Sequence, residues 1–380
     1  MHYKYKHLLI ILLVTGLSAQ LGWYTQNFES NLLLTGVSFP TANDGWAVGQ
    51  TNTILHTENG GETWLAQNVN PSSNYWAVYF HDNLNGWAVG SNGKIVHTVD
   101  GGSQWMDQES NTNWDIWDVF FIDEYTGWAV GGKPWDFTGP TQIILHTVDG
   151  GTNWQFQLYD SGEYPLKGVH FIDDQNGWAV GDTGYILYSA NGGANWIVQN
   201  SGTNIELNDV QFVSSIEGWA TGWQGILLHT TDAGNNWDLI NTGFSENFNS
   251  LHFVNEDQGW FAGADGLIVH TSDGGETWSL QESGTTNAIF DISFSSSIHG
   301  WAVGYLGTIL HTSTGGCECN PAGDLNEDVN VDVLDIVILV NIILGVVEPT
   351  DYQLNIGDMN SDTVLDVLDV VQIVNLIVGN

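Results

Sequence analysis

Two stretches near the C-terminal end of the sequence place oxygen-bearing side chains at short, regular intervals. The first stretch consists of Asp324, Asn326, Asp328, Asn330, Asp332 and Asp335. The second, 34 residues later, consists of Asp358, Asn360, Asp362, Val364, Asp366 and Asp369, with Val364 offering its backbone carbonyl. Calcium takes roughly six to eight oxygen ligands from carboxylates, amides and carbonyls, so this spacing predicts two Ca2+-binding loops. The alternative is an acidic, solvated tail that binds no metal.

An apolar run follows each loop and is expected to form the element that positions it. Residues 336–344 and 370–378 predict one helix after each loop. Such duplicated loop–helix units resemble type I dockerins. On this resemblance, residues 323–380 are interpreted as a dockerin-like domain and residues 317–322 as a linker.

The resemblance also implies a partner. The helices of type I dockerins bind cohesin domains on a scaffold protein or a cell surface, and loop positions 10 and 11 steer the choice of partner. The matching residues here are Val333, Leu334, Val367 and Leu368. Val329 and Thr363 stand at loop position 6, where that family usually has Gly, and this departure argues for weaker calcium binding.

The residues before the tail repeat one unit seven times. Gly-Trp-Ala-Val-Gly, or a close variant, recurs with its Trp at positions 46, 87, 128, 178, 219, 260 and 301, nearly always 41 residues apart. Each unit contains four short apolar runs bounded by Gly, Asn or Asp, which predict four β-strands. Four strands in about 41 residues is the size of a propeller blade. The sequence therefore predicts an all-β domain, a seven-bladed β-propeller over residues 20–316.

A residue missing from the last unit indicates how the ring closes. A second Trp follows the first in six units, but in the seventh the equivalent position is Cys319. The same spacing counted back from Trp64 reaches Trp23. We therefore expect the segment at Trp23 to supply the outer strand of the last blade, which leaves no open sheet edge.

A repeated turn precedes the second Trp and carries a family resemblance. In the second unit it reads Thr98-Val-Asp100-Gly-Gly102-Ser-Gln-Trp105, and six of the seven copies keep this form. The turn resembles the Asp-box, in which Asp or Asn bonds backbone amides and Gly accepts positive φ. Together with Gly-Trp-Ala-Val-Gly, it is similar to the propellers of photosystem II assembly factors of chloroplasts and cyanobacteria, and to those of sialidases and xyloglucanases. The resemblance implies a ring fold; the sialidase chemistry needs three Arg, and this chain has none.

Five Trp residues belong to neither repeated position, and with one Tyr they are candidates for ligand binding. They are Trp76, Trp114, Trp117, Trp135, Trp223 and Tyr305. All map to the loops before the first strand or between the second and third strands, on one face of the propeller. Exposed aromatic rings suit stacking on sugar rings or on apolar peptide groups. The alternative is that some of them fill the central channel.

Composition limits the partners. The chain has 44 acidic residues against five Lys, with a formal net charge of −39, so nucleic acid is excluded as a partner. Lys4 and Lys6 followed by a short apolar run predict a signal peptide over residues 1–19 and export from the cell. The mature chain is expected to have no transmembrane segment.

The predicted function is therefore that of a secreted, non-catalytic binding protein. Its propeller would recognise a glycan or a protein, and its tail would attach through calcium to a cohesin-like partner. The alternative is a polysaccharide-degrading glycoside hydrolase of a cellulosome-like complex. Asp115, Asp118, Asp136 and Asp182 lie near the predicted binding face and could supply a carboxylate pair for it.

Overall fold

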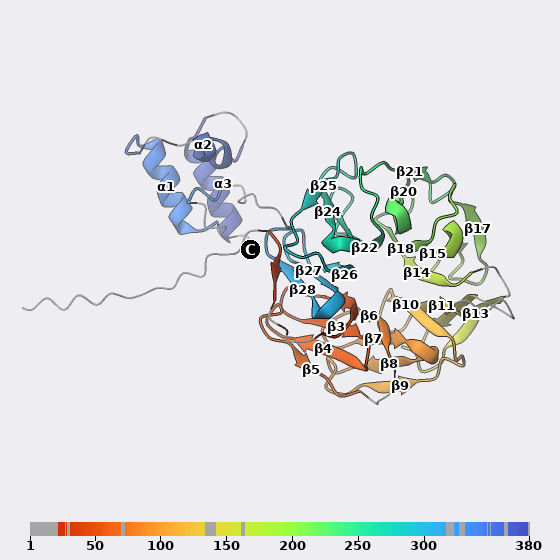
Figure 1. The fold of residues 1–380 in the computed structure, drawn as a ribbon. Coiled ribbons are helices and arrows are strands. Elements are labelled where there is room, and N and C mark those ends of the chain that lie inside the picture. Colours follow the sequence, from red (N-terminus) through yellow and green to blue (C-terminus); the bar gives the residue numbers. More distant parts are fainter. Residues whose placement is uncertain are drawn as a thin grey trace, which may run out of the picture. The chain divides into compact units, whose positions relative to one another are not determined.

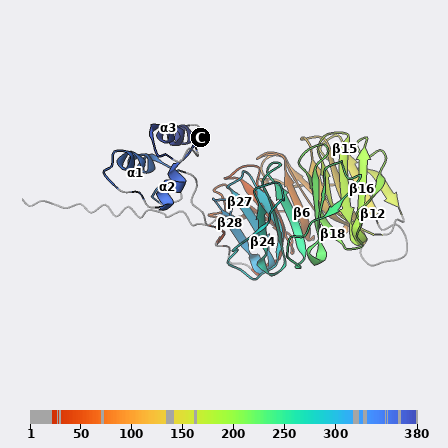
Figure 2. The same ribbon diagram turned by 90° about the horizontal axis from the view of Figure 1, so that it is seen from above.

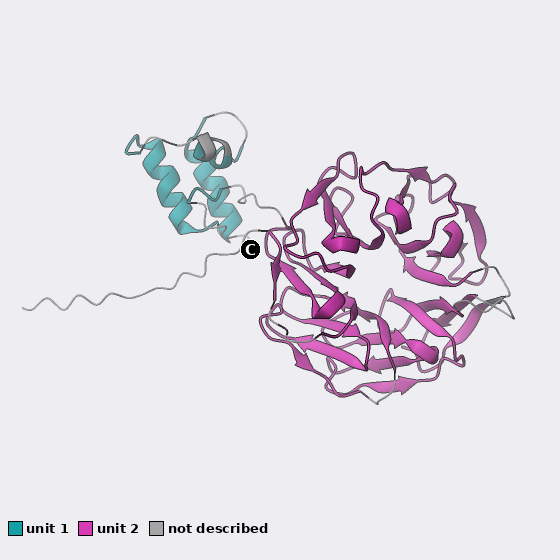
Figure 3. Cartoon of the chain, viewed as in Figure 1, with its two compact units in different colours: residues 1–21, 319–380 teal, residues 22–318 magenta. Residues whose placement is uncertain are grey.

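The computed structural model describes residues 22–26, 28, 31–69, 73–133, 142–160, 164–316, 323–326, 331–347, 349, 351–360 and 364–378. These residues form two compact units, one within residues 22–318 and one within residues 319–380 (Figure 3). Each unit is described by itself. The predicted signal peptide and linker, and also Trp135, Asp136, Asp328, Asn330 and Asp362, lie outside the described residues.

The first unit is a seven-bladed β-propeller, which confirms the predicted fold. Seven four-stranded antiparallel sheets form a ring (Figure 1), which Figure 2 shows from its side. Residues from all seven sheets line a central channel. The innermost strands are β2 (Leu34–Ser38), β6 (Tyr75–Phe80), β10 (Asp115–Phe121), β14 (Leu166–Phe171), β18 (Leu207–Phe212), β22 (Phe248–Phe253) and β26 (Ile289–Phe294). The second strands are β3 (Gly45–Gly49), β7 (Gly86–Gly90), β11 (Gly127–Gly132), β15 (Asn176–Gly181), β19 (Gly218–Gly222), β23 (Gly259–Gly263) and β27 (Gly300–Gly304).

The outer half of each blade completes the sheet. The third strands are β4 (Thr53–Thr57), β8 (Ile95–Thr98), β12 (Gln142–Thr147), β16 (Tyr185–Ala190), β20 (Leu227–Thr230), β24 (Ile268–Thr271) and β28 (Ile309–Thr312). The outermost strands are β5 (Leu65–Ala66), β9 (Met106–Gln108), β13 (Gln155–Asp160), β17 (Ile197–Asn200), β21 (Asp238–Leu239), β25 (Ser279–Gln281) and, for the last blade, β1 (Tyr24–Thr25). Blades are numbered 1 to 7 from β2 to β26.

Short 3-10 turns join the second and third strands in five blades. They are η1 (Ser91–Gly93), η2 (Asp182–Gly184), η3 (Trp223–Gly225), η4 (Ala264–Gly266) and η5 (Tyr305–Gly307). Because the strands alternate in direction, these turns lie on the face where the innermost strands begin. The Asp-box turns lie on the opposite face. The two are called the entry face and the Asp-box face below.

The Trp of Gly-Trp-Ala-Val-Gly is the main packing residue between blades. Trp87 is fully buried and stacks at 3.5 Å on Phe121 of the next blade. The Gly before it makes room for the Phe of its own blade, because a Cβ on Gly86 would lie 2.4 Å from the ring of Phe80. The motif therefore repeats because each blade packs against the next through the same large apolar contact.

The N-terminal strand closes the ring, as the missing Trp predicted. Strand β1 pairs antiparallel with β28, with Tyr24 opposite His311. Trp23 is 5% exposed and its Nε1 donates to Gln281 Oε1 at 2.8 Å. The Gly22 N–H also donates to Thr314, the residue that makes the seventh Asp-box turn irregular. The two ends of the propeller chain therefore share one blade.

A glutamine latch joins most neighbouring blades. Three residues after the second Trp of a blade, the Nε2 of a Gln donates to a carbonyl in the Asp-box turn of the next blade, at 2.6–3.0 Å. The six latches are formed by Gln26, Gln67, Gln108, Gln157, Gln199 and Gln281. Ile240 occupies this position at the junction of blades 5 and 6, so that junction lacks the latch.

The second unit contains helices α1 (Val333–Ile343), α2 (Asp351–Gly357) and α3 (Val367–Val378). The two predicted helices are present, and α1 starts earlier than predicted because Asp332 caps it, accepting the Leu334 N–H at 2.7 Å. Helix α2 was not predicted from the sequence. No helix among the described residues is long and apolar enough to span a bilayer.

Candidate functional site

A β-bulge in every innermost strand creates a ring of seven side chains at the entry face. The register shifts by one residue near the start of each of these strands, and the extra residue is left unpaired. The seven bulged residues are Thr35, Trp76, Trp117, Lys167, Asn208, Asn249 and Phe290. Three of them donate to a carbonyl of the next blade, for example Asn208 Nδ2 to Phe248 O at 2.8 Å. These seven residues are called the mouth ring below.

Three members of the mouth ring stack in sequence across blades 2, 3 and 4. The rings of Trp76 and Trp117 lie 5.1 Å apart at 26°, and Lys167 Nζ lies 4.3 Å from the Trp117 ring. The Nε1 atoms of both Trp residues are buried, so the partly exposed rings present carbon to the solvent. The stack offers an apolar surface with one cation at its end.

Two carboxylates hold Lys167 in this position. Its Nζ lies 3.7 Å from Glu206 and 4.0 Å from Asp182. Burial raises the pKa of both carboxyl groups, and the charge of Lys167 counteracts part of that rise. The sequence analysis did not identify Lys167; its position in the repeat, equivalent to Trp76 and Trp117, was the available signal.

The other predicted aromatic residues occupy different places on the same face. Trp223 and Tyr305 begin the turns η3 and η5 of blades 5 and 7 and are 42% and 50% exposed. Trp114 is partly buried and packs against the hydrophobic core shared by blades 2 and 3. The structure thus brings Trp76 and Trp117 into contact, and places Trp223 and Tyr305 on separate blades.

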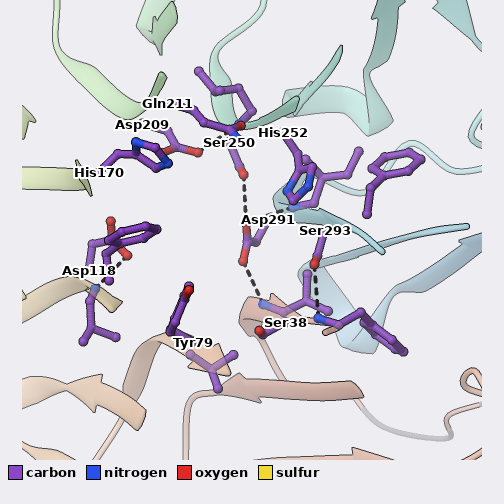
Figure 4. Close-up of a pocket in the computed structure, with 18 of the residues that line it drawn as sticks. Ser38, Tyr79, Asp118, His170, Asp209, Gln211, Ser250, His252, Asp291 and Ser293 are labelled. Carbon is purple, nitrogen blue, oxygen red and sulfur yellow. Dashed lines mark hydrogen bonds between the residues drawn. The ribbon is translucent and has the colours of Figure 1, made fainter. Parts of the chain in front are cut away.

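Below the mouth ring, three partly buried carboxylates face the channel, on blades 3, 5 and 7 (Figure 4). Asp118, Asp209 and Asp291 each accept a backbone N–H from the following blade, from Val169, Leu251 and Val37 respectively, at 2.7–2.9 Å. They line a cavity of about 260 Å3 together with His170 and His252. The carboxylates therefore act as ties between blades.

Burial shifts the pKa of each of these channel groups. The pKa of Asp209 rises to about 6 and that of Asp291 to about 7, and the pKa of Asp118 rises as well, with Asp209 adding to the effect. Burial lowers the pKa of His170 to about 3 and that of His252 to about 4. Uncharged forms are thus favoured inside the channel.

The carboxylates considered for a hydrolase have structural partners. Asp115 accepts the Asn92 N–H at 3.0 Å and Asp118 ties blade 3 to blade 4. Asp182 is the third candidate in the described residues, and it lies beside Lys167. These contacts give each of the three carboxylates a structural role that requires no catalytic activity.

In the second unit, the last Asp of each predicted calcium loop organises the loop backbone. Asp335 accepts the N–H groups of Leu325, Asn326 and Asp332 at 2.8–3.2 Å. Asp369 accepts the three equivalent N–H groups, from Met359, Asn360 and Asp366, at 2.9–3.3 Å. The described parts of the two loops thus share this hydrogen-bond pattern.

Three acidic side chains of the predicted calcium loops lie inside the second unit. Asp324, Asp335 and Asp369 are fully buried, and the sequence from residue 323 to residue 380 contains no Lys, Arg or His to balance them. Among the described residues, no group of three or more acidic, His or Cys side chains converges on one point. The predicted partner-binding residues Val333, Leu334, Val367 and Leu368 are 55–65% exposed.

Comparison with known proteins bears on the propeller. The sequence profile of the photosynthesis system II assembly factor YCF48 family matches residues 17–106, 66–161 and 154–244. A search of curated protein sequences found no significant match.

Solved structures agree in fold. A structure titled "YCF48 bound to D1 peptide" is 23% identical over 77% of this chain and 97% of that chain, with a TM-score of 0.64. YCF48 from Cyanidioschyzon merolae is 20% identical over 77% of this chain and 98% of that chain, with a TM-score of 0.62. The GH74 enzyme of Niastella koreensis is 12% identical over 76% of this chain and 53% of that chain, with a TM-score of 0.59.

Proposed function

The chain belongs to the photosynthesis system II assembly factor YCF48 family, and from that membership we propose that it is a non-catalytic binding protein whose mouth ring holds a polypeptide ligand. The observation that carries the proposal is the stack of Trp76, Trp117 and Lys167 at one end of the channel. The other rim positions are Thr, Asn and Phe, so this sector differs in chemistry from the rest of a nearly repeated ring.

The geometry favours a peptide over a glycan. A sugar ring needs a free aromatic face to stack on. Trp117 already contacts the Trp76 ring and Lys167, so it offers a ligand mainly its edge and its remaining carbon surface. Apolar side chains of a peptide pack against such a surface without needing a flat platform. A related propeller, YCF48, has been solved with a D1 peptide bound, which supports a polypeptide as the ligand class.

Charge defines the ligand further. With 44 acidic residues against five Lys, the protein attracts neutral or basic segments and repels acidic ones. Beside Trp117, the two carboxylates Asp182 and Glu206 face the single cation of Lys167, which leaves a negative charge for a basic ligand residue. The favoured ligand is therefore a peptide with an apolar residue next to a Lys or Arg.

A binding screen tests this function. The purified chain is applied to an array of peptides that vary in aromatic and basic content, and to a panel of soluble polysaccharides. The strongest ligand is then titrated against the variant Trp76→Ala/Trp117→Ala and against Ile197→Ala, which removes a 63% exposed side chain from outer strand β17. We expect peptide binding that weakens at least tenfold in the first variant only. Binding of polysaccharides alone, or equal binding by both variants, would refute the proposal.

For the second unit, we propose calcium binding and docking to a cohesin-like partner, in a protein exported from the cell. The buried carboxylates of Asp324, Asp335 and Asp369, in a segment without cationic side chains, support a divalent cation as the balancing charge. The exposed Val333, Leu334, Val367 and Leu368 support a partner surface beside each loop.

Calcium titration of the full chain tests this part. Circular dichroism at 222 nm should gain helical signal between chelator and millimolar Ca2+, and isothermal titration calorimetry should report two sites. An unchanged spectrum together with no heat of binding would remove the calcium proposal, while leaving the peptide site of the propeller untouched.

A further inference from the structure

On the Asp-box face, two neighbouring blades each carry a pair of exposed apolar side chains. In blade 2, Leu84 and Val99 are 56% and 52% exposed. In blade 3, Tyr125 and Val148, at the equivalent positions, are 56% and 67% exposed. These four residues are called the blade 2–3 patch below.

Hydrogen bonds link the turns that carry the four side chains. The Gly101 N–H donates to Leu84 O at 3.1 Å, which joins the Asp-box turn containing Val99 to the turn containing Leu84. The Gly150 N–H donates to Tyr125 O at 2.9 Å and joins the corresponding turns of blade 3. Blade 2 reaches the same turn of blade 3, because Gln108 Nε2 and Trp87 Nε1 both donate to Gly150 O.

The internal repeat shows that the patch is not needed for folding. At the two positions, blade 1 has Asn43 and Glu58 and blade 6 has Asp257 and Ser272, in the same turns. Blades 5 and 7 keep one apolar residue each, Ile216 and Ile298, and blade 4 has Gln and Ala. Turns that fold equally well with polar residues do not require the exposed hydrophobic pairs of blades 2 and 3, so a binding role explains them better.

Carboxylates lie in the same turns as the patch and are called the carboxylate rim below. Asp82 and Asp123 each accept two backbone N–H groups of the turns that present Leu84 and Tyr125. Asp149 is next to Val148, and donors from Asn153 hold its pKa below the usual value, so it is ionised at neutral pH. These turns contain Asp, Glu and neutral residues but no Lys or Arg. Charge complementarity therefore selects a basic partner.

We infer that the blade 2–3 patch is a second binding surface, on the face opposite the mouth ring, for a polypeptide segment whose apolar side chains are flanked by lysine or arginine. The apolar residues of the segment cover Leu84, Val99 and the neighbouring pair, and its cations approach the carboxylate rim. A neutral or acidic apolar segment lacks the second interaction.

Two synthetic peptides of equal length test the inference. Both carry the same Leu and Trp residues, flanked in one by Lys and in the other by Glu, and binding to the full chain is measured by fluorescence anisotropy at about 0.15 M salt, where exposed charges are partly screened. The patch variant replaces Leu84, Val99, Tyr125 and Val148 with Ser. The matched control is Ile216→Ser/Ile298→Ser, which changes exposed apolar residues at the same turn position in blades 5 and 7. All six substitutions are at exposed sites, where effects on stability are small.

We expect the Lys-flanked peptide to bind, the patch variant to weaken it at least tenfold, and the control to change it less than twofold. Equal binding by all variants would mean that the acidic surface binds any cationic peptide and would overturn the inference. So would no binding of the Lys-flanked peptide, or equal binding of the Glu-flanked one. Loss of binding in Trp76→Ala/Trp117→Ala, with the patch variant unaffected, would place the peptide at the mouth ring and reject the second surface.

Discussion

The junction of blades 5 and 6 should be the weakest of the ring, and Ile240→Gln should strengthen it. At this junction Trp219 Nε1 and Trp278 Nε1 are buried without a hydrogen-bond partner among the described residues. At most other junctions the Nε1 atoms of the two equivalent Trp residues donate hydrogen bonds. For example, Trp46 Nε1 donates to Gly101 O and Trp105 Nε1 donates to Gln67 Oε1. The junction of blades 3 and 4 is intermediate, since Gln157 keeps its latch but Trp196 Nε1 has no partner in the described part of the chain.

The missing latch also shifts an aromatic ring. The centroids of Trp219 and Phe253 are 5.2 Å apart, whereas the equivalent pairs stack at 3.4–3.7 Å. A Cβ on Gly275 would lie 2.3 Å from the Trp219 ring, while at six equivalent glycines the nearest group is the latch Gln. Trp219 thus fills the space that a Gln would occupy.

The expected gain follows from two hydrogen bonds. A buried N–H without a partner costs about 1–3 kcal/mol, and two such groups are satisfied if the introduced glutamine forms the latch and Trp219 returns to the stacked position. The substitution also removes the half-buried Ile240 side chain from its apolar cluster, which lowers the stability by about 1 kcal/mol. We expect a net gain of about 1–5 kcal/mol and a rise in Tm of about 2–4 °C per kcal/mol.

Differential scanning calorimetry and hydrogen exchange provide the assay. Ile240→Gln should raise Tm and slow amide exchange in β21 and β23, and Ile240→Met, of similar size without an amide, should do neither. The reciprocal variant Gln108→Ile should lower Tm by creating a second junction of the weak kind. If Ile240→Gln lowers Tm, or if the methionine variant raises it equally, the latch is not what sets the strength of the junction.

Three further predictions concern closure, acid stability and the tail. Trp23→Ala should destabilise the propeller by about 3–5 kcal/mol in chemical denaturation, because a buried ring and its hydrogen bond to Gln281 are lost. A loss of stability below about 1 kcal/mol, the size of an ordinary surface effect, would contradict ring closure by this strand. Burial lowers the pKa of His97 to about 4, so its unfolded form binds more protons and stability falls as pH drops from about 6.5 to 4. His97→Phe should reduce the slope of unfolding free energy against pH in this range and change the free energy little above about pH 7. An unchanged slope would show that His97 does not cause the loss of stability in acid. Asp335→Ala should remove the helical signal of the first loop–helix unit in circular dichroism, because three backbone N–H groups lose their acceptor; full retention would show that the loop folds without it.

The channel carboxylates act in the opposite direction to the histidines. Because the pKa of Asp291 is raised to about 7, its contribution to stability is fully present below about pH 4 and is lost as pH rises through 7. The pH dependence of the whole protein is therefore a sum of opposing slopes, and single variants such as His97→Phe are needed to separate them.

The sequence by itself determined the ring. Seven copies of Gly-Trp-Ala-Val-Gly at a nearly constant spacing required seven equivalent packing sites, and the displaced Trp23 required the chain ends to meet. Local chemistry was also readable in the Asp-box turns, whose hydrogen bonds join residues within a few positions of one another. The cap of α1 by Asp332 is equally local but was not predicted. Features of this kind can be predicted from the sequence because their geometry is local or repeated.

Only the tertiary structure decided which side chains meet. Trp76, Trp117 and Lys167 belong to three different blades, and a bulge in each innermost strand turns them onto one rim. The same holds for the hydrogen bond between Asp118 and Val169 of the next blade. It also holds for the indole N–H groups of Trp219 and Trp278, which have no partner within the described residues. Contacts between blades depend on register and on the closure of the ring, and neither has a signature in a single repeat.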